Sequence, residues 1–252
     1  MNPYYKVEDI RQHFVDELES ENFTIDRNGS KTIEMIGASF IADEDCIFGT
    51  LNRSYINAEI HWYNSQSLNI NDIYGPDREP PKAWKLTADH RGEINSNYGK
   101  LIYANGHWNQ YESCLKTLID NPDSRRASMI YNRPSIHFEC TWNGRNDFIC
   151  TNAVTYYVRD NKLEVVVQMR SNDAWAGYRN DLAWQKHVQE KLLSDFNEAT
   201  NSNVELGSIN WQVMNLHVYQ RNFYLIDAYV KGHNSLSKSE YRVMFPDSPY
   251  CE

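Results

Sequence analysis

The sequence lacks the features of a membrane-anchored or secreted protein. None of its apolar runs reaches the length of a transmembrane helix, and the N-terminal stretch "MNPYYKVEDIRQHF" contains no apolar signal core. Its five cysteines are odd in number and widely spaced, without a CxxC pair or the spacing of zinc ligands. We therefore interpret them as reduced thiols, and we expect a cytoplasmic protein that binds no metal and no membrane.

Several common catalytic motifs are also absent. There is no P-loop, no GxGxxG fingerprint, no HExxH zinc motif and no GxSxG serine motif. The net charge of -9 argues against a broad nucleic-acid-binding face, although it leaves room for a local cationic pocket. No repeat and no Pro-, Gly- or Ser-rich linker divides the chain. We therefore expect a single domain over residues 1–252, without direct binding to nucleic acid.

Hydrophobic periodicity and turn residues predict a mixture of helices and strands. The predicted helices cover 6–20, 54–66, 107–119 and 180–197. A turn at Asn28-Gly29 leads into one strand, and further strands are predicted over 127–131, 148–158, 162–170 and 209–219. Residues 67–97 are expected to be mostly loop. The fold class is therefore α/β (α+β), with a sheet in the core and helices outside it.

Arginines stand beside serines and glycines where predicted strands begin or end. Arg125 and Arg126 directly precede one strand, Arg170 ends another and is followed by Ser171, and Arg27 lies in a glycine turn. Any one of these arginines taken alone is best explained as solvated surface. As a set, they are typical of a site that holds a phosphate through forked donors.

Cys150 and Glu59 are candidates for catalysis, each with a simpler alternative. Cys150 falls inside a predicted apolar strand, where a cysteine is usually a small buried hydrophobic residue. It would act as a nucleophile only if nearby positive charge favoured the thiolate. Glu59 lies on a predicted aromatic helix, as either a solvated residue or a buried acid that relays protons.

Two further stretches combine polar and small residues. In "QMRSNDAWAGYRND", Asp173 and Asp181 flank Gly177, which leaves room for backbone to approach a ligand. Asp181 lies near a predicted helix start, where a carboxylate is often a simple cap. In "NLHVYQRNF", His217 and Tyr219 share one face of a strand. They are either core residues or a pair that holds a sugar hydroxyl.

Eight segments of the chain, taken together and in order, resemble the thymidylate synthase family. They are "DRNG", "NAEIHW", "INSNYGK", "NPDSRR", "DFICTNAV", "QMRSND", "AGYRND" and "LHVY". Within that family the chain looks most similar to the deoxycytidylate hydroxymethylases of T-even-like bacteriophages. The resemblance implies a mixed β-sheet with surrounding helices, a homodimer formed through the sheet, and location in the host cytoplasm. An enzyme of nucleotide precursors could also contact other enzymes of that kind.

The resemblance also implies a role for each candidate residue. Cys150 matches the nucleophile, and Glu59 matches the acid that organises water and proton transfers. The positions that match ligands of the nucleotide phosphate and sugar are Arg27, Arg170, Ser171, His217 and Tyr219, with Arg125 and Arg126 reaching across the dimer. The positions that match the folate side are Trp84, Tyr98, Asp173 and Gly177. The implied co-substrate is 5,10-methylenetetrahydrofolate.

Three departures from the synthase pattern bear on the substrate. The nucleophile lies between Ile149 and Thr151 instead of the usual Pro and His, and the C-terminal stretch "MFPDSPYCE" has no clear counterpart of the closing tail. Asp181 replaces the usual Asn that reads uracil, and a carboxylate accepts a hydrogen bond from the amino group of cytosine. The expected substrate is therefore dCMP. The alternatives are dUMP, CMP, ordinary thymidylate synthesis, and a catalytically inactive homologue that binds nucleotide or folate.

Overall fold

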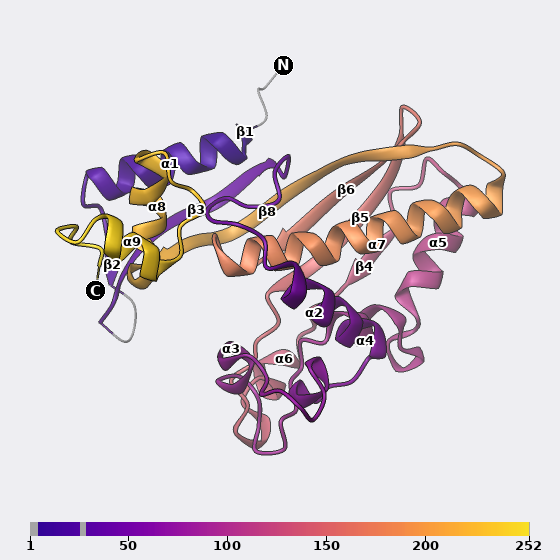
Figure 1. The fold of residues 1–252 in the computed structure, drawn as a ribbon. Helices are drawn as coiled ribbons and strands as arrows, with labels where there is room; N and C mark the ends of the chain where they lie inside the picture. Colours follow the sequence, from indigo (N-terminus) through magenta and orange to yellow (C-terminus); the bar gives the residue numbers. More distant parts are fainter. Residues whose placement is uncertain (1–4, 26–28, 252) are drawn as a thin grey trace. The chain divides into compact units, whose positions relative to one another are not determined.

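The structure is a computed structural model that describes residues 5–25 and 29–251 (Figure 1). The chain divides into two compact units. The first unit comprises residues 1–51, 170–183 and 208–252, and the second comprises residues 52–169 and 184–207. Both the long helix α7 (Ala176–Thr200) and the long strand β8 (Glu205–Tyr219) contribute residues to each unit.

The first unit contains a sheet with both parallel and antiparallel pairs. Its strands are β1 (Tyr5–Lys6), β2 (Thr24–Ile25), β3 (Lys31–Ile41), β7 (Asn172–Asp173) and the later part of β8. Strand β3 pairs with β8 antiparallel, from Thr32 opposite Tyr219 to Ile41 opposite Asn210, while β1 on β3 and β7 on β8 are parallel pairs. The helices of this unit, besides the start of α7, are α1 (Val7–Glu19), η4 (Gln220–Asn222), α8 (Phe223–Val230) and α9 (Lys238–Met244).

The second unit contains an antiparallel sheet and most of the helices. Strands β4 (Ser128–Ile130), β5 (Thr151–Arg159) and β6 (Lys162–Met169) pair in that order (Figure 1). The helices are α2 (Arg53–Ser65), η1 (Ile70–Ile73), α3 (Lys82–Lys85), α4 (Tyr98–Tyr103), η2 (Asn105–His107), α5 (Gln110–Asp120), α6 (Ile136–Glu139) and η3 (Trp142–Gly144). The expectation of a mixed sheet with helices around it is confirmed. The single domain over 1–252 stays a prediction.

Alternation and helical spacing explain which side chains form the two cores. On β6, Leu163, Val165, Val167 and Met169 are fully buried at every second position, as expected of a strand with one face in the core. On α1, Val7, Ile10, Phe14 and Leu18 are buried at helical spacing. Burial of these side chains is the main favourable term in folding each unit.

Two general expectations can be compared with the described residues. No helix in this part of the chain is both long and apolar enough to cross a bilayer. All five cysteines lie within the described ranges, and none of them forms a disulfide.

Candidate active site

Glu59 is a buried acid in the second unit, held by two aromatic side chains. Its carboxylate accepts hydrogen bonds from the hydroxyl of Tyr55, one turn earlier on α2, and from the indole N–H of Trp84 at 3.2 Å. Trp84 also donates to the Tyr55 hydroxyl oxygen at 2.8 Å. Burial raises the pKa of Glu59 to about 7, although both hydrogen bonds act against the shift. The carboxyl can therefore donate or accept a proton near neutral pH. Of the two readings considered above, the solvated helix residue is wrong.

Replacing Glu59 by Gln is expected to stabilise the protein at alkaline pH. Between pH 4.5, the ordinary pKa of a glutamate, and about pH 7, the unfolded chain has released this proton while the folded protein still holds it. The stability that the group contributes is therefore complete at low pH and is lost as the pH rises through that window. Above pH 7, Glu59→Gln should unfold with a free energy up to about 3 kcal/mol higher than wild type.

Urea unfolding at several pH values between 5 and 8 tests this expectation. The matched control is Glu190→Gln, which removes an exposed carboxyl from α7. The control should follow the wild-type stability across the whole range. A Glu59→Gln protein that also follows the wild type at every pH would show that Glu59 ionises like a surface carboxyl.

Cys150 lies at a bend immediately before β5, not inside the strand as predicted. The apolar pair Phe148 and Ile149 looks like the start of a strand in the sequence, but ladder pairing begins only at Thr151. The register with β6 then shifts at Asn152, which is a β-bulge. Bulges commonly occur beside active sites, where they change the direction of a side chain.

The environment of Cys150 differs from that of a structural cysteine. Its side chain is half-buried, and its sulfur lies 3.8 Å from the carbonyl oxygen of Phe148. Cys114 on α5 offers the contrast, because it is 2% exposed and burial raises the pKa of its thiol to about 12. Of the two thiols, Cys150 is the one placed where a reactant could reach it.

A buried polar network holds the loop that leads to Cys150. The Asp147 carboxylate accepts hydrogen bonds from the backbone N–H groups of Asn95 and Ser96, at 2.5 and 2.8 Å, and from the Ser96 hydroxyl at 2.6 Å. Arg145 donates to Asn95 at 2.8 Å and forms ion pairs with Asp89 and Glu93. These contacts fix the segment before Cys150 against the segment before α4. Sequence reasoning missed this network, because its members lie in two loops about fifty residues apart in the chain.

The other predicted residues of the second unit are either buried or exposed. Tyr98 is 3% exposed, with its ring stacked on Tyr63 and edge-on to Tyr131, both at 5.2 Å between centroids. Arg125 and Arg126 are exposed in the turn before β4, and neither forms an ion pair within the described part of the chain. The folate role of Tyr98 and the phosphate role of both arginines stay predictions.

In the first unit, Asp173 and not Asp181 caps helix α7. The Asp173 carboxylate accepts hydrogen bonds from the backbone N–H groups of Trp175 and Ala176, at 2.7 and 3.1 Å. The helix therefore begins at Ala176, four residues before the predicted start, and Asp181 lies in its second turn. The capping explanation for Asp181 is wrong, because its carboxylate lies too far along the helix to reach the first N–H groups.

Asp181 instead accepts a hydrogen bond from a neighbouring amide. The Nδ2 of Asn172 donates to Oδ2 of Asp181 at 2.7 Å, and the Oδ1 of Asn172 accepts from the indole N–H of Trp211 at 3.3 Å. Gly177 leaves room for this amide, since a Cβ there would lie 2.9 Å from Nδ2 of Asn172 and would force it to shift. Asn172 was not singled out in the sequence, although it stands inside "RSND".

His217 and Tyr219 lie on the same side of β8, as predicted, with ring centroids 4.7 Å apart. His217 is buried, and burial lowers the pKa of its imidazole, although the Asp173 carboxylate opposes this. Strands β7 and β8 place Asp173 opposite His217. The pair thus presents a neutral imidazole and a phenol near an acid, which suits hydrogen bonding to a neutral hydroxyl.

The predicted phosphate ligands of the first unit are only partly described. Arg170 follows β6 directly, and both it and Ser171 are half-buried. Arg27 lies outside the described residues. Among the described residues no group of three or more His, Cys, Asp or Glu side chains could hold a metal ion.

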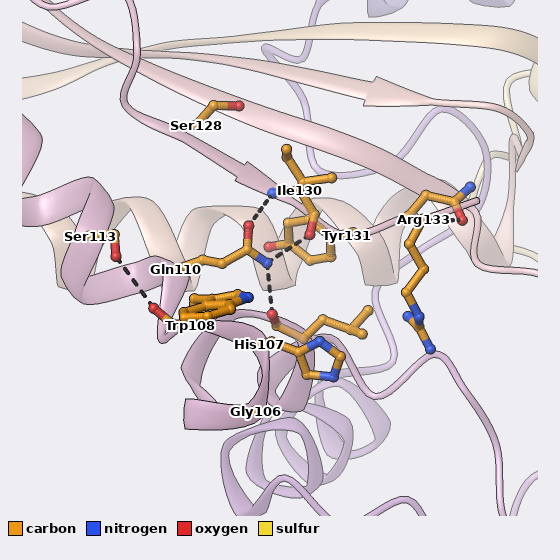
Figure 2. Close-up of a pocket in the computed structure, with 11 residues that line it drawn as sticks. Gly106, His107, Trp108, Gln110, Ser113, Ser128, Ile130, Tyr131 and Arg133 are labelled. Atoms are coloured by element: carbon orange, nitrogen blue, oxygen red, sulfur yellow. Dashed lines mark hydrogen bonds between the residues drawn. The ribbon is translucent and has the colours of Figure 1, made fainter. Parts of the chain in front are cut away.

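The second unit also contains a cavity that none of the predicted residues lines. Its volume is about 360 Å³, and its wall includes His107, Trp108, Ile130 and Arg133 (Figure 2). The Gln110 side chain bridges the N–H and C=O of Ile130 and the carbonyl of Leu101, at 2.7 to 2.9 Å (Figure 2). Gln110 therefore occupies backbone groups on the outer edge of β4. An edge strand covered in this way cannot pair with a strand of another chain at that point.

Comparison with known proteins places this site in a family. Residues 11–241 match the sequence profile described as "Thymidylate synthase". The chain belongs to the thymidylate synthase family. This confirms the resemblance seen in the eight sequence segments, and it covers most of the chain.

Two branches of the thymidylate synthase family match to different degrees. The chain is 51% identical over 237 residues to the deoxycytidylate 5-hydroxymethyltransferase of Enterobacteria phage T4, covering 93% of this chain and 95% of the relative. The enzyme of the same name from phage T6 is 50% identical over 238 residues, covering 94% and 96%. A thymidylate synthase of Corynebacterium aurimucosum is 25% identical over 209 residues, covering 77% and 71%.

Proposed function

We propose that this chain is a deoxycytidylate 5-hydroxymethyltransferase. It would transfer a one-carbon unit from 5,10-methylenetetrahydrofolate to carbon 5 of dCMP and add water to give 5-hydroxymethyl-dCMP. The observation that carries the proposal is identity of 50% or more, over more than nine-tenths of the chain, to phage enzymes of that name. The carboxylate at position 181 supports the same substrate, for the reasons given below.

Cys150 would be the nucleophile. Carbon 5 of cytosine is unreactive while the ring is aromatic, and a bond from the Cys150 sulfur to carbon 6 removes that aromaticity. Carbon 5 then behaves like the carbon of an enamine, and one difficult step is divided into easier ones. The bend and the bulge at the start of β5 support this role, because they place a half-exposed thiol at the end of a rigid strand.

Asp181 would select cytosine through the hydrogen bonds that its carboxylate can accept. Cytosine presents an amino donor, and a proton on ring nitrogen 3 would give a second donor. Uracil presents an oxygen at carbon 4, so a carboxylate facing it would place two acceptors against each other. A buried polar group left unpaired costs about 1–3 kcal/mol, which favours dCMP over dUMP. Protonated cytosine takes up electron density during attack, and Asp181 would stabilise it.

Glu59 would order the water that completes the reaction. The folate supplies the one-carbon unit, carbon 5 loses its proton, and the folate is released as tetrahydrofolate, which leaves an exocyclic methylene on carbon 5. Water adds its oxygen to that methylene, the proton goes to solvent through Glu59, and the bond from carbon 6 to Cys150 breaks. No electrons are gained or lost overall, so the reaction needs no reductant. A carboxyl whose pKa is raised to about 7 is suited to this proton transfer.

The remaining residues would bind the two substrates. Arg27, Arg170 and Ser171 would hold the phosphate, and His217 and Tyr219 would hold the sugar hydroxyl. On the folate side we propose Trp84, Tyr98, Asp173 and Gly177. The Trp84 ring fits this role best, because its N–H is engaged by Tyr55 and Glu59 while the ring itself is half-buried and suited to stacking.

In the proposed homodimer, Arg125 and Arg126 bind the nucleotide phosphate in the active site of the other subunit. This arrangement predicts that two different inactive subunits can restore activity when they form a mixed dimer. The exposure of both arginines and their lack of an ion pair in the described chain support this arrangement. Arg126→Ala and Cys150→Ala proteins should each be inactive. When equal amounts of the two proteins exchange subunits, about half of the dimers contain one subunit of each kind. Each of these dimers has one intact site out of two, so roughly a quarter of the wild-type activity should return. Mixed dimers that form and stay inactive would contradict sharing of the site.

The identity of the product tests the proposed function. The purified protein is incubated with 5,10-methylenetetrahydrofolate and, separately, with dCMP, dUMP or CMP, and the products are identified by mass. We expect 5-hydroxymethyl-dCMP from the first nucleotide and little product from the others. Methylated dUMP would instead indicate a synthase. Nucleotide binding without any product would indicate an inactive homologue.

A further inference from the structure

We propose that Asn172 is a positioning residue for base selection and that Trp211 fixes the direction of its amide. The inference rests on the proposed base-reading role of Asp181 and adds a device that makes this role specific. Asn172 would hold one carboxylate oxygen of Asp181 and thereby determine which way the other oxygen faces. All three residues belong to the first unit.

The direction of the Asn172 amide follows from the chemistry of Trp211. An indole N–H donates and never accepts, so the atom of Asn172 that lies 3.3 Å from it must be the carbonyl oxygen. The NH2 group of Asn172 then faces Asp181, where it donates to Oδ2 at 2.7 Å. Both Asn172 and Trp211 are buried, at 4% and 0% exposure, so water does not compete for the bond between them.

The packing around the amide leaves little freedom to turn. Trp211 lies edge-on to the ring of Tyr178, with 5.5 Å between centroids. Strand β7 holds the Asn172 backbone parallel to β8, opposite Leu216. Gly177 leaves space for the Asn172 amide, because a Cβ at this position would lie 2.9 Å from its nitrogen. The glycine therefore serves the contact between Asn172 and Asp181, whatever further role it has toward folate.

A fixed donor at this point imposes a requirement on residue 181. Only an acceptor can face the Asn172 NH2 group. Asp181 is thus held with Oδ2 toward Asn172. If the donor were lost, the carboxylate could rotate. Recognition of the cytosine amino group would weaken, while binding of the sugar and phosphate would not change.

The test compares the preference for dCMP over dUMP in three variants. Asn172→Leu removes the donor and keeps the branched shape of the side chain. Trp211→Phe keeps a ring in the core but frees the amide to turn its oxygen toward Asp181. The control is Asn222→Leu, which removes an equally buried amide of the first unit, at the end of η4. Dissociation constants for both nucleotides are measured by calorimetry, kcat/KM is measured for both, and thermal unfolding is followed in parallel.

We expect Asn172→Leu to lower the ratio of kcat/KM for dCMP to that for dUMP by about ten- to a hundredfold, the effect of one charge-assisted hydrogen bond. Trp211→Phe should lower it severalfold, and the control should keep the wild-type ratio. A purely structural role would reduce activity with both nucleotides equally and leave the ratio unchanged. If Asn172→Leu does not fold, the ratio in Trp211→Phe decides.

The outcomes separate this inference from the function on which it rests. A wild-type protein that shows no preference for dCMP would refute the proposed function and this inference with it. A wild-type preference that survives unchanged in folded Asn172→Leu, or in Trp211→Phe, would refute only the role of Asn172.

Discussion

Cys150→Ala is expected to lower kcat with dCMP by at least about a thousandfold, because no other group would form the bond to carbon 6. The dissociation constant for dCMP should change by less than about tenfold, since phosphate, sugar and base contacts all remain. Steady-state kinetics and calorimetry on the same preparation measure the two effects. The combination separates loss of a nucleophile from loss of the nucleotide site.

Cys140→Ala is the matched control for this prediction. Cys140 is also a half-buried thiol of the second unit, at the end of α6, and it has no proposed role. Its replacement should leave kcat close to the wild-type value. If Cys150→Ala kept wild-type turnover, or if Cys140→Ala lost as much activity as Cys150→Ala, the nucleophile would be wrongly assigned.

Asp181→Asn is expected to reverse the base preference, changing the ratio of kcat/KM for dCMP to that for dUMP by about a hundredfold or more. The reason lies in the neighbouring donor. The NH2 group of Asn172 requires an acceptor, so the carbonyl oxygen of the new amide would turn toward it. The new NH2 group would then take the position of the second carboxylate oxygen, where it would match the carbon 4 oxygen of uracil.

The control for this substitution is Asp120→Asn. Asp120 is an exposed carboxylate at the end of α5, ion-paired with Lys116 at 2.7 Å. Its replacement changes the net charge equally and should not alter the base preference. An Asp181→Asn protein that folds and keeps the wild-type ratio would show that another residue distinguishes the two bases.

The strongly periodic elements could be predicted from the sequence, because their pattern follows from local geometry. The predicted helix 6–20 is observed as Val7–Glu19, and 54–66 is observed as Arg53–Ser65. Strand β6 extends over Lys162–Met169, within one residue of its prediction. In each case a single apolar face packs against a core, which is what periodicity reports.

Other elements depend on contacts that a local pattern does not contain. Helix α7 begins early because Asp173, held on β7, caps it from outside the periodic segment. Helices α8 and α9 were not predicted. Helix α8 is apolar on nearly all sides, so most of its residues are buried and its sequence does not show a single apolar face. Strand β5 starts late because pairing begins only at Thr151, beside the bulge.

The candidate site shows the same division. Cys150, Glu59 and Asp181 could be named from residue type and resemblance, but the raised pKa of Glu59 comes from its burial, and its hydrogen bond with Trp84 joins segments that meet only in the fold. The bond from Asn172 to Asp181 joins positions nine residues apart on a strand and a helix. Neither partnership leaves a signal in the sequence alone.

The central claim is that water, and not hydride, completes the transfer. The most direct measurement is to run the reaction with dCMP and 5,10-methylenetetrahydrofolate in oxygen-18-labelled water and to analyse both products by mass spectrometry. We expect one labelled oxygen in the hydroxymethyl group of the nucleotide and release of tetrahydrofolate. A methylated nucleotide without the label, formed together with dihydrofolate, would contradict the claim.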